Sequence, residues 1–518
     1  MEIKYIGEQL IWGHLGNGFI FTAFISALFA SILYLTGTLK EQHAGWTHPL
    51  ARKFLYLHSL SGFGIFFLLL FLIYNHRFEY YYVWQHSNLS MPMHYILACI
   101  WEGQEGSFLL WMLWHSVIAL FISRRNRNWE GPVVGIIMLV QVFLGSMLLG
   151  VYVFDYKIGS NPFTLLRLND QFANLPFVRM PDYLSRIEDG RGLNPLLQNY
   201  WMVIHPPTLF LGFAATVVPF AFAMGGLMKK NITEWVRPAL PYTFFAIMIL
   251  GAGILMGAAW AYEALSFGGF WAWDPVENAS LVPWLTLVGA GHVMLIFIKR
   301  ERALISTYIL SIISFLLVLY STFLTRSGIL GETSVHAFTD LGMSGQLIFY
   351  MLFFVFLAAT LLIINWKKIP KEHSDDSINS REFWMFIGML VLCISAIQIT
   401  FTTSIPVINK IFDVKLAPPV DVKEHFNSWQ LPIAVIIALL MAVGQFFKYK
   451  NSDTKQVFKK LILSISLTII ITIVLTLLLK FKSVHFILLL FASLLSIIAN
   501  ADYFFRVLHG KFSFSGAS

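Results

Sequence analysis

The sequence is poor in charge. Asp, Glu, Lys and Arg make up 12% of its 518 residues, whereas soluble globular domains carry about 25%. Hydrophobic residues make up 57%. This balance excludes a soluble globular protein and indicates a polytopic membrane protein, a chain that crosses a bilayer many times. The formal net charge of +8 requires no nucleic-acid partner, because basic cytoplasmic loops are typical of membrane proteins.

Cysteine is also scarce. The two cysteines, Cys99 and Cys393, lie far apart in the sequence, each within an apolar run. We interpret them as buried, unreactive thiols rather than as a redox pair. The chain has no Cys-x-x-Cys-His motif, which excludes covalent attachment of a c-type haem to the chain itself.

The N-terminus lacks the basic stretch and cleavage site of a secretory signal peptide, so the first apolar run is predicted to be a retained span. A membrane-spanning helix needs about 20 apolar residues, and about thirteen runs qualify. The sequence therefore predicts an all-α membrane protein with about thirteen transmembrane helices. They centre on residues 18–37, 54–74, 106–122, 132–153, 206–227, 240–260, 280–298, 303–323, 345–365, 383–401, 430–447, 460–479 and 483–504.

Basic residues cluster in the loops that follow alternate runs. Examples are Arg124, Arg125 and Arg127, then Lys299, Arg300 and Arg302, then Lys367, Lys368 and Lys371. The positive-inside rule therefore predicts that the N-terminus lies outside and the C-terminus inside. The polar loop 366–382 is predicted to be a cytoplasmic connector between a core, 1–365, and the C-terminal helices, 383–518.

A polar and aromatic segment, residues 268–280, separates two long apolar runs with the sequence Gly-Gly-Phe-Trp-Ala-Trp-Asp-Pro-Val-Glu-Asn-Ala-Ser. Asp274 before Pro275, with Glu277 three positions after Asp274, predicts an acidic N-cap and a helix start. Trp271 and Trp273 would share one face if the segment were extended. Aromatic belts and caps occur in ordinary membrane proteins. Alternatively, the two indoles form a binding surface for a large, flat, apolar ligand.

Two histidines fall on the predicted outer side, as this segment does. His205 precedes Pro206, which predicts a position at the mouth of the next span, either as a plain cap or as a ligand. His336 follows the span 303–323 and is either a surface residue or a ligand. If the two imidazoles face each other across an aromatic slot, they form a bis-histidine haem site.

Other histidines lie within predicted spans, where an ionisable side chain is a functional candidate. His292 is either a packed residue bonded to a serine or carbonyl, or an iron ligand. His58 and His115 are indistinguishable in sequence from core histidines with satisfied hydrogen bonds.

Residues 268–280 resemble the tryptophan-rich signature of the haem-handling proteins of cytochrome c maturation. The resemblance is to the CcmF type in particular, which is related to CcsA and NrfE. Further stretches resemble that family in the same order, over nearly the whole chain: residues 101–107, 192–197, 205–212, 322–328 and 334–338. Phe267 stands where the family has tryptophan, which is a conservative difference.

The resemblance implies a haem lyase component of cytochrome c biogenesis that acts in a complex in the bacterial inner membrane. Such a protein holds haem at the outer face for thioether attachment to an apocytochrome c carrying Cys-x-x-Cys-His. The implied partners are a haem chaperone of the CcmE type, CcmH-type thioredoxin-like or chaperone subunits, and membrane lipid.

The resemblance also implies roles for individual residues. The delivered haem iron would be held by His205 and His336. Its macrocycle would contact the outer WWD-type segment, residues 262–284, through Trp271, Trp273 and Asp274. His292 would be an axial ligand of a permanent haem b. The family's second haem b ligand has no clear counterpart here, because His485 lies at an outer helix end and His509 in the tail.

Two other functions stay open on the sequence alone. A haem b electron-transfer subunit would use His292 and a second histidine for its haem, and the outer slot for quinone. The second alternative is a solute transporter without a cofactor. Transporters, however, place their polar helix breaks near the midplane of the membrane. Here the polar breaks fall at the predicted outer surface.

Overall fold

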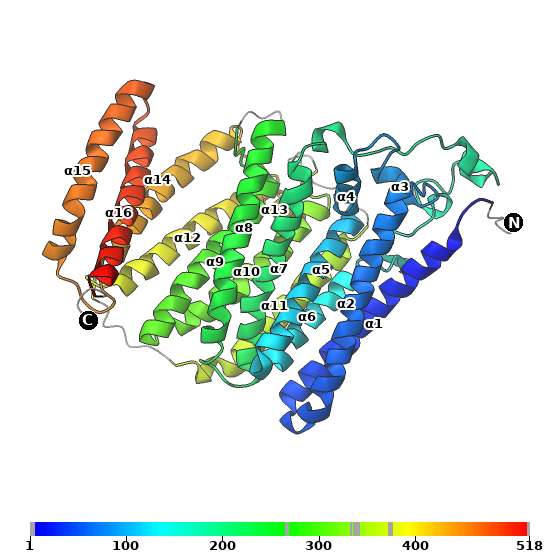
Figure 1. The fold of residues 1–518 in the computed structure, drawn as a ribbon, viewed down its shortest axis with the longest axis horizontal. Helices are drawn as coiled ribbons and strands as arrows, with labels where there is room; N and C mark the ends of the chain where they lie inside the picture. Colours follow the sequence, from blue (N-terminus) through cyan, green and yellow to red (C-terminus); the bar gives the residue numbers. More distant parts are fainter. Residues whose placement is uncertain (1–5, 265–268, 332–333, 335–341, 371–376, 515–518) are drawn as a thin grey trace. The chain divides into compact units, whose positions relative to one another are not determined.

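The computed structural model describes residues 6–264, 269–331, 334, 342–370 and 377–514. Within these residues, thirteen helices are long and apolar enough to cross a membrane. This agrees with the number expected from the sequence and confirms a multi-pass, helical membrane protein. Figure 1 shows these helices as long rods, with the few irregular segments at their ends.

The spanning helices follow one another along the chain, with short elements between them. The long helices are α1 (Leu10–Leu39), α2 (Ala44–Tyr74), α5 (Gln104–Arg125), α6 (Glu130–Ser146), α7 (Trp201–Met228), α8 (Val236–Ala264), α9 (Pro275–Arg300), α10 (Leu304–Arg326), α11 (Ser344–Asn365), α12 (Arg381–Thr403), α14 (Val422–Val443), α15 (Thr454–Leu479) and α16 (Val484–Phe514). The short helices are α3 (Tyr81–His86), α4 (Met93–Glu102) and α13 (Ile405–Phe412). Single 3-10 turns occur at η1 (Glu41–His43), η2 (Arg127–Trp129), η3 (Leu166–Leu168), η4 (Phe177–Arg179), η5 (Tyr183–Arg186), η6 (Pro195–Leu197), η7 (Trp366–Lys368) and η8 (Gly444–Phe446).

The chain forms two compact units. The first comprises Met1–Ser280 and Ser311–Lys368, and the second comprises Leu281–Leu310 and Ile369–Ser518. The boundaries therefore fall inside α9, inside α10 and directly after η7, between Lys368 and Ile369.

The first unit has a core rich in aromatic side chains. Phe143 of α6 stacks on Tyr350 of α11 with ring centroids 4.8 Å apart, and Phe220 of α7 lies 4.7 Å from Phe315 of α10. A partly buried ion pair joins α2 to α6, because Arg52 and Glu130 approach to 2.6 Å. These contacts join α2, α6, α7, α10 and α11 within the first unit, and α7 carries His205.

One predicted span is longer than the helix observed. The apolar run 132–153 continues past the end of α6 at Ser146, and its last residues form a strand. Strand β1 (Val151–Val153) pairs antiparallel with β2 (Tyr156–Ile158). Gly159, at a left-handed φ of +73°, lies so close to the helix end that an added Cβ would be 2.4 Å from the carbonyl oxygen of Ser146. The chain therefore turns back against α6 instead of extending it.

The second unit packs its last helices around a small apolar cluster. This cluster joins α14, η8, α15 and α16 through the buried side chains of Ala442, Phe446, Val457, Leu461, Leu495 and Ala499. Figure 1 shows α14, α15 and α16 in orange to red. In the same unit Arg300 at the end of α9 pairs with Glu382 at the start of α12, at 2.8 Å.

Candidate functional site

The segment before α9 is fixed by hydrogen bonds to its own helix. The Glu277 carboxylate oxygen Oε2 accepts from the backbone N–H groups of Asp274 and Ala272, at 3.1 and 3.0 Å. The Asp274 oxygen Oδ1 accepts from the N–H of Val276 at 2.9 Å. Helix α9 begins at Pro275. The predicted start, with an acidic cap, proline at the first position and a glutamate reaching back, is confirmed.

The rings of the two tryptophans of this segment are in contact, but the backbone between them is not extended. Trp273 has a left-handed φ of +59°, so the alternation expected for an extended segment is wrong. The rings of Trp271 and Trp273 instead pack edge to face, with centroids 5.9 Å apart. Within the described residues, the buried indole nitrogen of Trp271 donates to no acceptor. The result is a compact aromatic corner at the start of α9.

Asp274 also ties this corner to the segment that follows α10. The Ser334 hydroxyl donates to Asp274 Oδ1 at 2.7 Å. Ser334 stands two positions before His336 in the sequence. His336 itself lies outside the described residues, so its position relative to the tryptophans stays a prediction.

His205 lies inside α7, which begins at Trp201. The expectation that His205 precedes the helix, because Pro206 follows it, is therefore wrong. Pro206 lacks the N–H that would bond the carbonyl of Met202 one turn earlier. The indole N–H of Trp101 supplies that hydrogen bond instead, at 2.9 Å. A side chain from α4 thus lets the helix continue through the proline.

The His205 ring is held by the glycine-lined face of α8. Its Nδ1–H donates to the carbonyl of Gly253 at 2.9 Å. The Trp260 ring lies edge-on at a centroid distance of 5.8 Å. Gly257 leaves room for the imidazole, since an added Cβ would lie 2.8 Å from His205 Cε1. The ring orientation is therefore set by backbone geometry on the neighbouring helix.

Aromatic and acidic groups surround the end of α8. Glu263 accepts from the indole of Trp201 at 2.9 Å and from the hydroxyl of Tyr200 at 3.1 Å. Burial and the Glu263 carboxylate raise the pKa of the Tyr200 hydroxyl. Tyr262 stacks on Phe270 at 4.3 Å, with the rings nearly parallel. This stacking connects the end of α8 to the segment that carries the two tryptophans.

Arg326 lies in the family-like stretch 322–328, but the sequence alone indicated no role for it. Arg326 closes α10 and is only 6% exposed. Its guanidinium lies over the rings of Phe108 and Phe210, 5.0 and 5.9 Å from their centroids. A buried arginine on two phenylalanine faces is a strong cation–π arrangement. The signal in the sequence was a lone arginine after a long apolar run.

His292 lies in the part of α9 that belongs to the second unit. It is half-buried, and its Nδ1–H donates to the carbonyl of Val288 in the same helix at 2.8 Å. Gly289 beside it permits close packing, because an added Cβ would meet Met389 and Leu310 at 3.3 and 3.4 Å. Among the described residues of this unit, His425 bonds to Thr402 and His485 is exposed.

His58 and His115, which were expected to be core residues with satisfied hydrogen bonds, differ in the bonds that their rings make. His58 is fully buried, and its Nδ1–H donates to the carbonyl of Ala23 at 2.8 Å, while its other nitrogen has no partner within the described chain. His115 is fully buried and stacks on Trp111, but neither of its nitrogens bonds to a described residue. The expectation of satisfied hydrogen bonds is half right for His58 and wrong for His115. Across the described ranges, no three His, Cys, Asp or Glu side chains gather as a metal cluster.

Comparison with known proteins identifies relatives over most of the chain. Residues 101–331 match the family described as cytochrome C assembly protein. The cytochrome c-type biogenesis protein CcmF of Pseudomonas fluorescens is 34% identical over 386 residues, which is 73% of this chain and 54% of that protein. CcmF of Escherichia coli is 30% identical over 458 residues, 87% of this chain and 66% of that protein. The biogenesis protein NrfE of Haemophilus influenzae is 29% identical and covers 83% of this chain.

A solved structure shows the same fold. The cytochrome c haem lyase CcmF superposes with a TM-score of 0.71 at 22% identity, over 96% of this chain and 72% of that one. The chain spans between about half and two thirds of the length of these curated CcmF relatives. On the family match, the curated relatives and the shared fold together, this chain belongs to the CcmF-type cytochrome c biogenesis proteins.

Proposed function

We propose that this protein is a haem lyase component that holds haem at the non-cytoplasmic membrane face for attachment to apocytochrome c. The observation that carries the proposal is the bond from Ser334 to Asp274. This bond places Ser334, which stands two positions before His336 in the sequence, beside the corner formed by Trp271 and Trp273. The three relatives named above bear cytochrome c biogenesis names, and the solved structure with the same fold is named a cytochrome c haem lyase.

In this proposal His205 and His336 ligate the iron of the delivered haem. Because Nδ1 of His205 is engaged with Gly253, iron coordination falls to Nε2. Metal-ligating histidines commonly bond a backbone carbonyl through their other nitrogen, which fixes ring orientation. Trp271 and Trp273 contact the macrocycle. Glu277 holds their backbone in place by accepting from the N–H groups of Ala272 and Asp274.

The reaction would be addition of each thiol of Cys-x-x-Cys-His across a haem vinyl group. A carbon–sulfur bond forms and the thiol hydrogen moves to the neighbouring vinyl carbon, so no oxidant is consumed. The chain offers orientation of the two reactants rather than a nucleophile, and orientation alone is a large rate effect. The partner's histidine then replaces a protein ligand on iron.

His292 would be a residue of this chain that holds the iron of a resident haem b. Its Nδ1 is already bonded to a carbonyl, as in ligating histidines. Such a haem would supply electrons that keep the substrate iron reduced. The second ligand is not assigned to a residue of this chain.

The rest of the assignment follows from the same proposal. The membrane is the bacterial inner membrane, with the N-terminus outside and the C-terminus inside. Residues 1–365 handle haem, 366–382 form a cytoplasmic connector, and 383–518 form the C-terminal helices. A CcmE-type chaperone delivers haem, and CcmH-type subunits present the apocytochrome.

The test is holocytochrome c yield in cells that carry His205→Ala, His336→Ala or the control His485→Ala. His485 lies at the start of α16 and is exposed. We expect the first two variants to insert in the membrane but to abolish assembly, and the control to behave as wild type. Normal yield in both ligand variants would overturn the proposal. A tightly held haem with quinol activity and normal cytochromes c would favour the electron-transfer alternative.

A further inference from the structure

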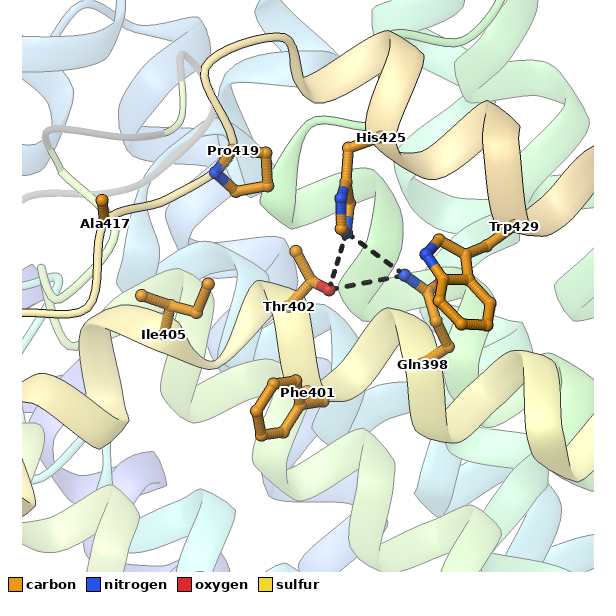
Figure 2. A pocket seen from close by; sticks show the side chains of 8 residues that line it. All are labelled: Gln398, Phe401, Thr402, Ile405, Ala417, Pro419, His425 and Trp429. Carbon is orange, nitrogen blue, oxygen red and sulfur yellow. Dashed lines mark hydrogen bonds between the residues drawn. The ribbon is translucent and has the colours of Figure 1, made fainter.

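The second unit contains an open pocket of about 430 Å³ between α12, α13 and α14 (Figure 2). Its walls are mostly apolar. They are formed by Phe401, Ile405, Ala417, Pro419 and Trp429. The polar side chains that line it are Gln398, Thr402 and His425, which Figure 2 shows joined to one another by hydrogen bonds.

The loop that covers the pocket is held in a single shape. The Asn409 side chain bonds both backbone groups of Leu416: its Nδ2 donates to the carbonyl and its Oδ1 accepts from the N–H, each at 2.9 Å. Asp413 adopts a left-handed φ of +52° at the end of α13. Asp421 then caps α14 by accepting from the N–H of Glu424 at 2.8 Å. The pocket is therefore formed before any ligand binds.

A directed chain of hydrogen bonds ends at His425. The Ser395 hydroxyl donates to Gln430 at 2.6 Å, and Gln430 Nε2 donates to Gln398 at 2.7 Å. Gln398 Nε2 then faces His425 Nε2 at 3.4 Å, and the Thr402 hydroxyl lies 3.2 Å from the same nitrogen. An amide nitrogen can only donate, so His425 Nε2 accepts.

This chain fixes the tautomer of the imidazole. A neutral imidazole that accepts at Nε2 carries its hydrogen on Nδ1. His425 lines the pocket beside the apolar side chains, and the lining contains no Asp, Glu, Lys or Arg. Its ligand must present an uncharged acceptor oxygen joined to an apolar body.

The pocket lies where two spanning helices end. Thr402 is the penultimate residue of α12, and His425 is the fourth residue of α14. Trp429 is 55% exposed and Phe401 63% exposed, as expected for side chains that meet lipid near the membrane interface. At this depth the hydrocarbon core gives way to the polar headgroup region of the bilayer, where the ester carbonyls of phospholipids lie.

The segments that contribute residues to the pocket also carry exposed charges of both signs. Lys410, Lys415 and Lys423 are exposed on α13, the covering loop and α14. The same segments expose three acidic residues, Asp413, Asp421 and Glu424. A balanced set of charges complements a headgroup with one phosphate and one ammonium group, and gives no preference to a headgroup with phosphate alone.

We propose that this pocket binds a zwitterionic glycerophospholipid, with an ester carbonyl accepting from His425 Nδ1–H and an acyl chain against Phe401 and Ile405. The phosphate and ammonium groups then lie near the exposed charges of these segments. The site is separate from the haem-handling function proposed above, and its test does not depend on that function.

The experiment is native mass spectrometry of the purified, delipidated full chain. Equal amounts of phosphatidylethanolamine and phosphatidylglycerol are added, and bound lipid is counted. The variants are His425→Leu, which removes the donor, and Ala417→Trp, which fills the pocket from an exposed loop position. His485→Leu is the control, because His485 is exposed at the start of another helix.

We expect one retained phosphatidylethanolamine in wild type and control. Loss of one hydrogen bond of about 1 kcal/mol lowers binding about five-fold in His425→Leu. Ala417→Trp abolishes the retained lipid while the protein elutes normally. Equal retention in all four proteins, a preference for phosphatidylglycerol, or a retained isoprenoid quinone in place of phospholipid would each overturn the proposal.

Discussion

At the scale of single residues, the candidate site depends on side chains that replace missing backbone hydrogen bonds. Pro206 removes one donor from the first turns of α7, and Trp101 restores it from another helix. His205 lies one position before that proline, so its placement depends on this indole. Trp101 is thus a positioning residue for His205 rather than a group that touches haem.

Replacing Trp101 by phenylalanine tests this role. The ring is kept but the carbonyl of Met202 loses its donor, so we expect unfolding free energy to fall by about 1–3 kcal/mol. Thermal unfolding of the purified protein measures that loss, and holocytochrome c yield should fall with it. Trp46→Phe is the matched control, because Trp46 is 57% exposed on α2. Equal melting of both variants would contradict the role given to the indole.

Gly257 offers a second test at this scale. An added methyl group would lie 2.8 Å from His205 Cε1, so Gly257→Ala should displace the imidazole and lower cytochrome c assembly. Gly18→Ala has open space in α1 and should leave assembly unchanged. Haem-stained gels of cells carrying each variant measure the difference. Normal assembly in Gly257→Ala would mean that the ring has room to move.

At the scale of elements, local signals predicted helix starts well where the capping residues lie in the same segment. The start of α9 at Pro275 was predictable because Asp274 and Glu277, which lie in the same segment, accept capping hydrogen bonds from its backbone. The start of α7 could not be predicted in this way, because Trp101, which donates a hydrogen bond to the Met202 carbonyl in its first turn, is remote in the sequence. The short helices α3, α4 and α13 were missed for a related reason, since none is long enough to qualify as a span.

Glu277 makes the cap of α9 testable. Glu277→Ala removes the acceptor of two backbone N–H groups, so we expect about 1–2 kcal/mol less protection of residues 269–278. Hydrogen–deuterium exchange of this segment measures the change. Glu424→Ala is the control, since Glu424 occupies the same turn of α14 but there Asp421 accepts the capping bond. Unchanged exchange in Glu277→Ala would show that the segment is held by other contacts.

At the scale of the whole molecule, hydropathy predicted the number of spans but not their grouping. Thirteen runs in the sequence correspond to thirteen helices, because a span must satisfy its backbone inside lipid by itself. The boundaries inside α9 and α10 depend on contacts between distant helices and have no sequence signal of their own, whereas the boundary between Lys368 and Ile369 falls in the polar loop 366–382. The arrangement of the candidate site could not be predicted from local sequence either, because the hydrogen bond from Ser334 to Asp274 joins segments 60 positions apart.

Orientation is the prediction that decides on which side of the membrane this chemistry takes place. The excess of basic residues in alternate loops places residues 229–235 inside and the loop 154–205 outside. We expect a membrane-impermeant maleimide to label Glu188→Cys in intact cells and Thr233→Cys only after permeabilisation; both positions are exposed. Background labelling should be low, because Cys393 is half-buried and burial raises the pKa of the Cys99 thiol, which keeps it protonated. The opposite labelling pattern would place the tryptophan corner and His205 on the cytoplasmic side, where an apocytochrome c awaiting haem outside could not reach them.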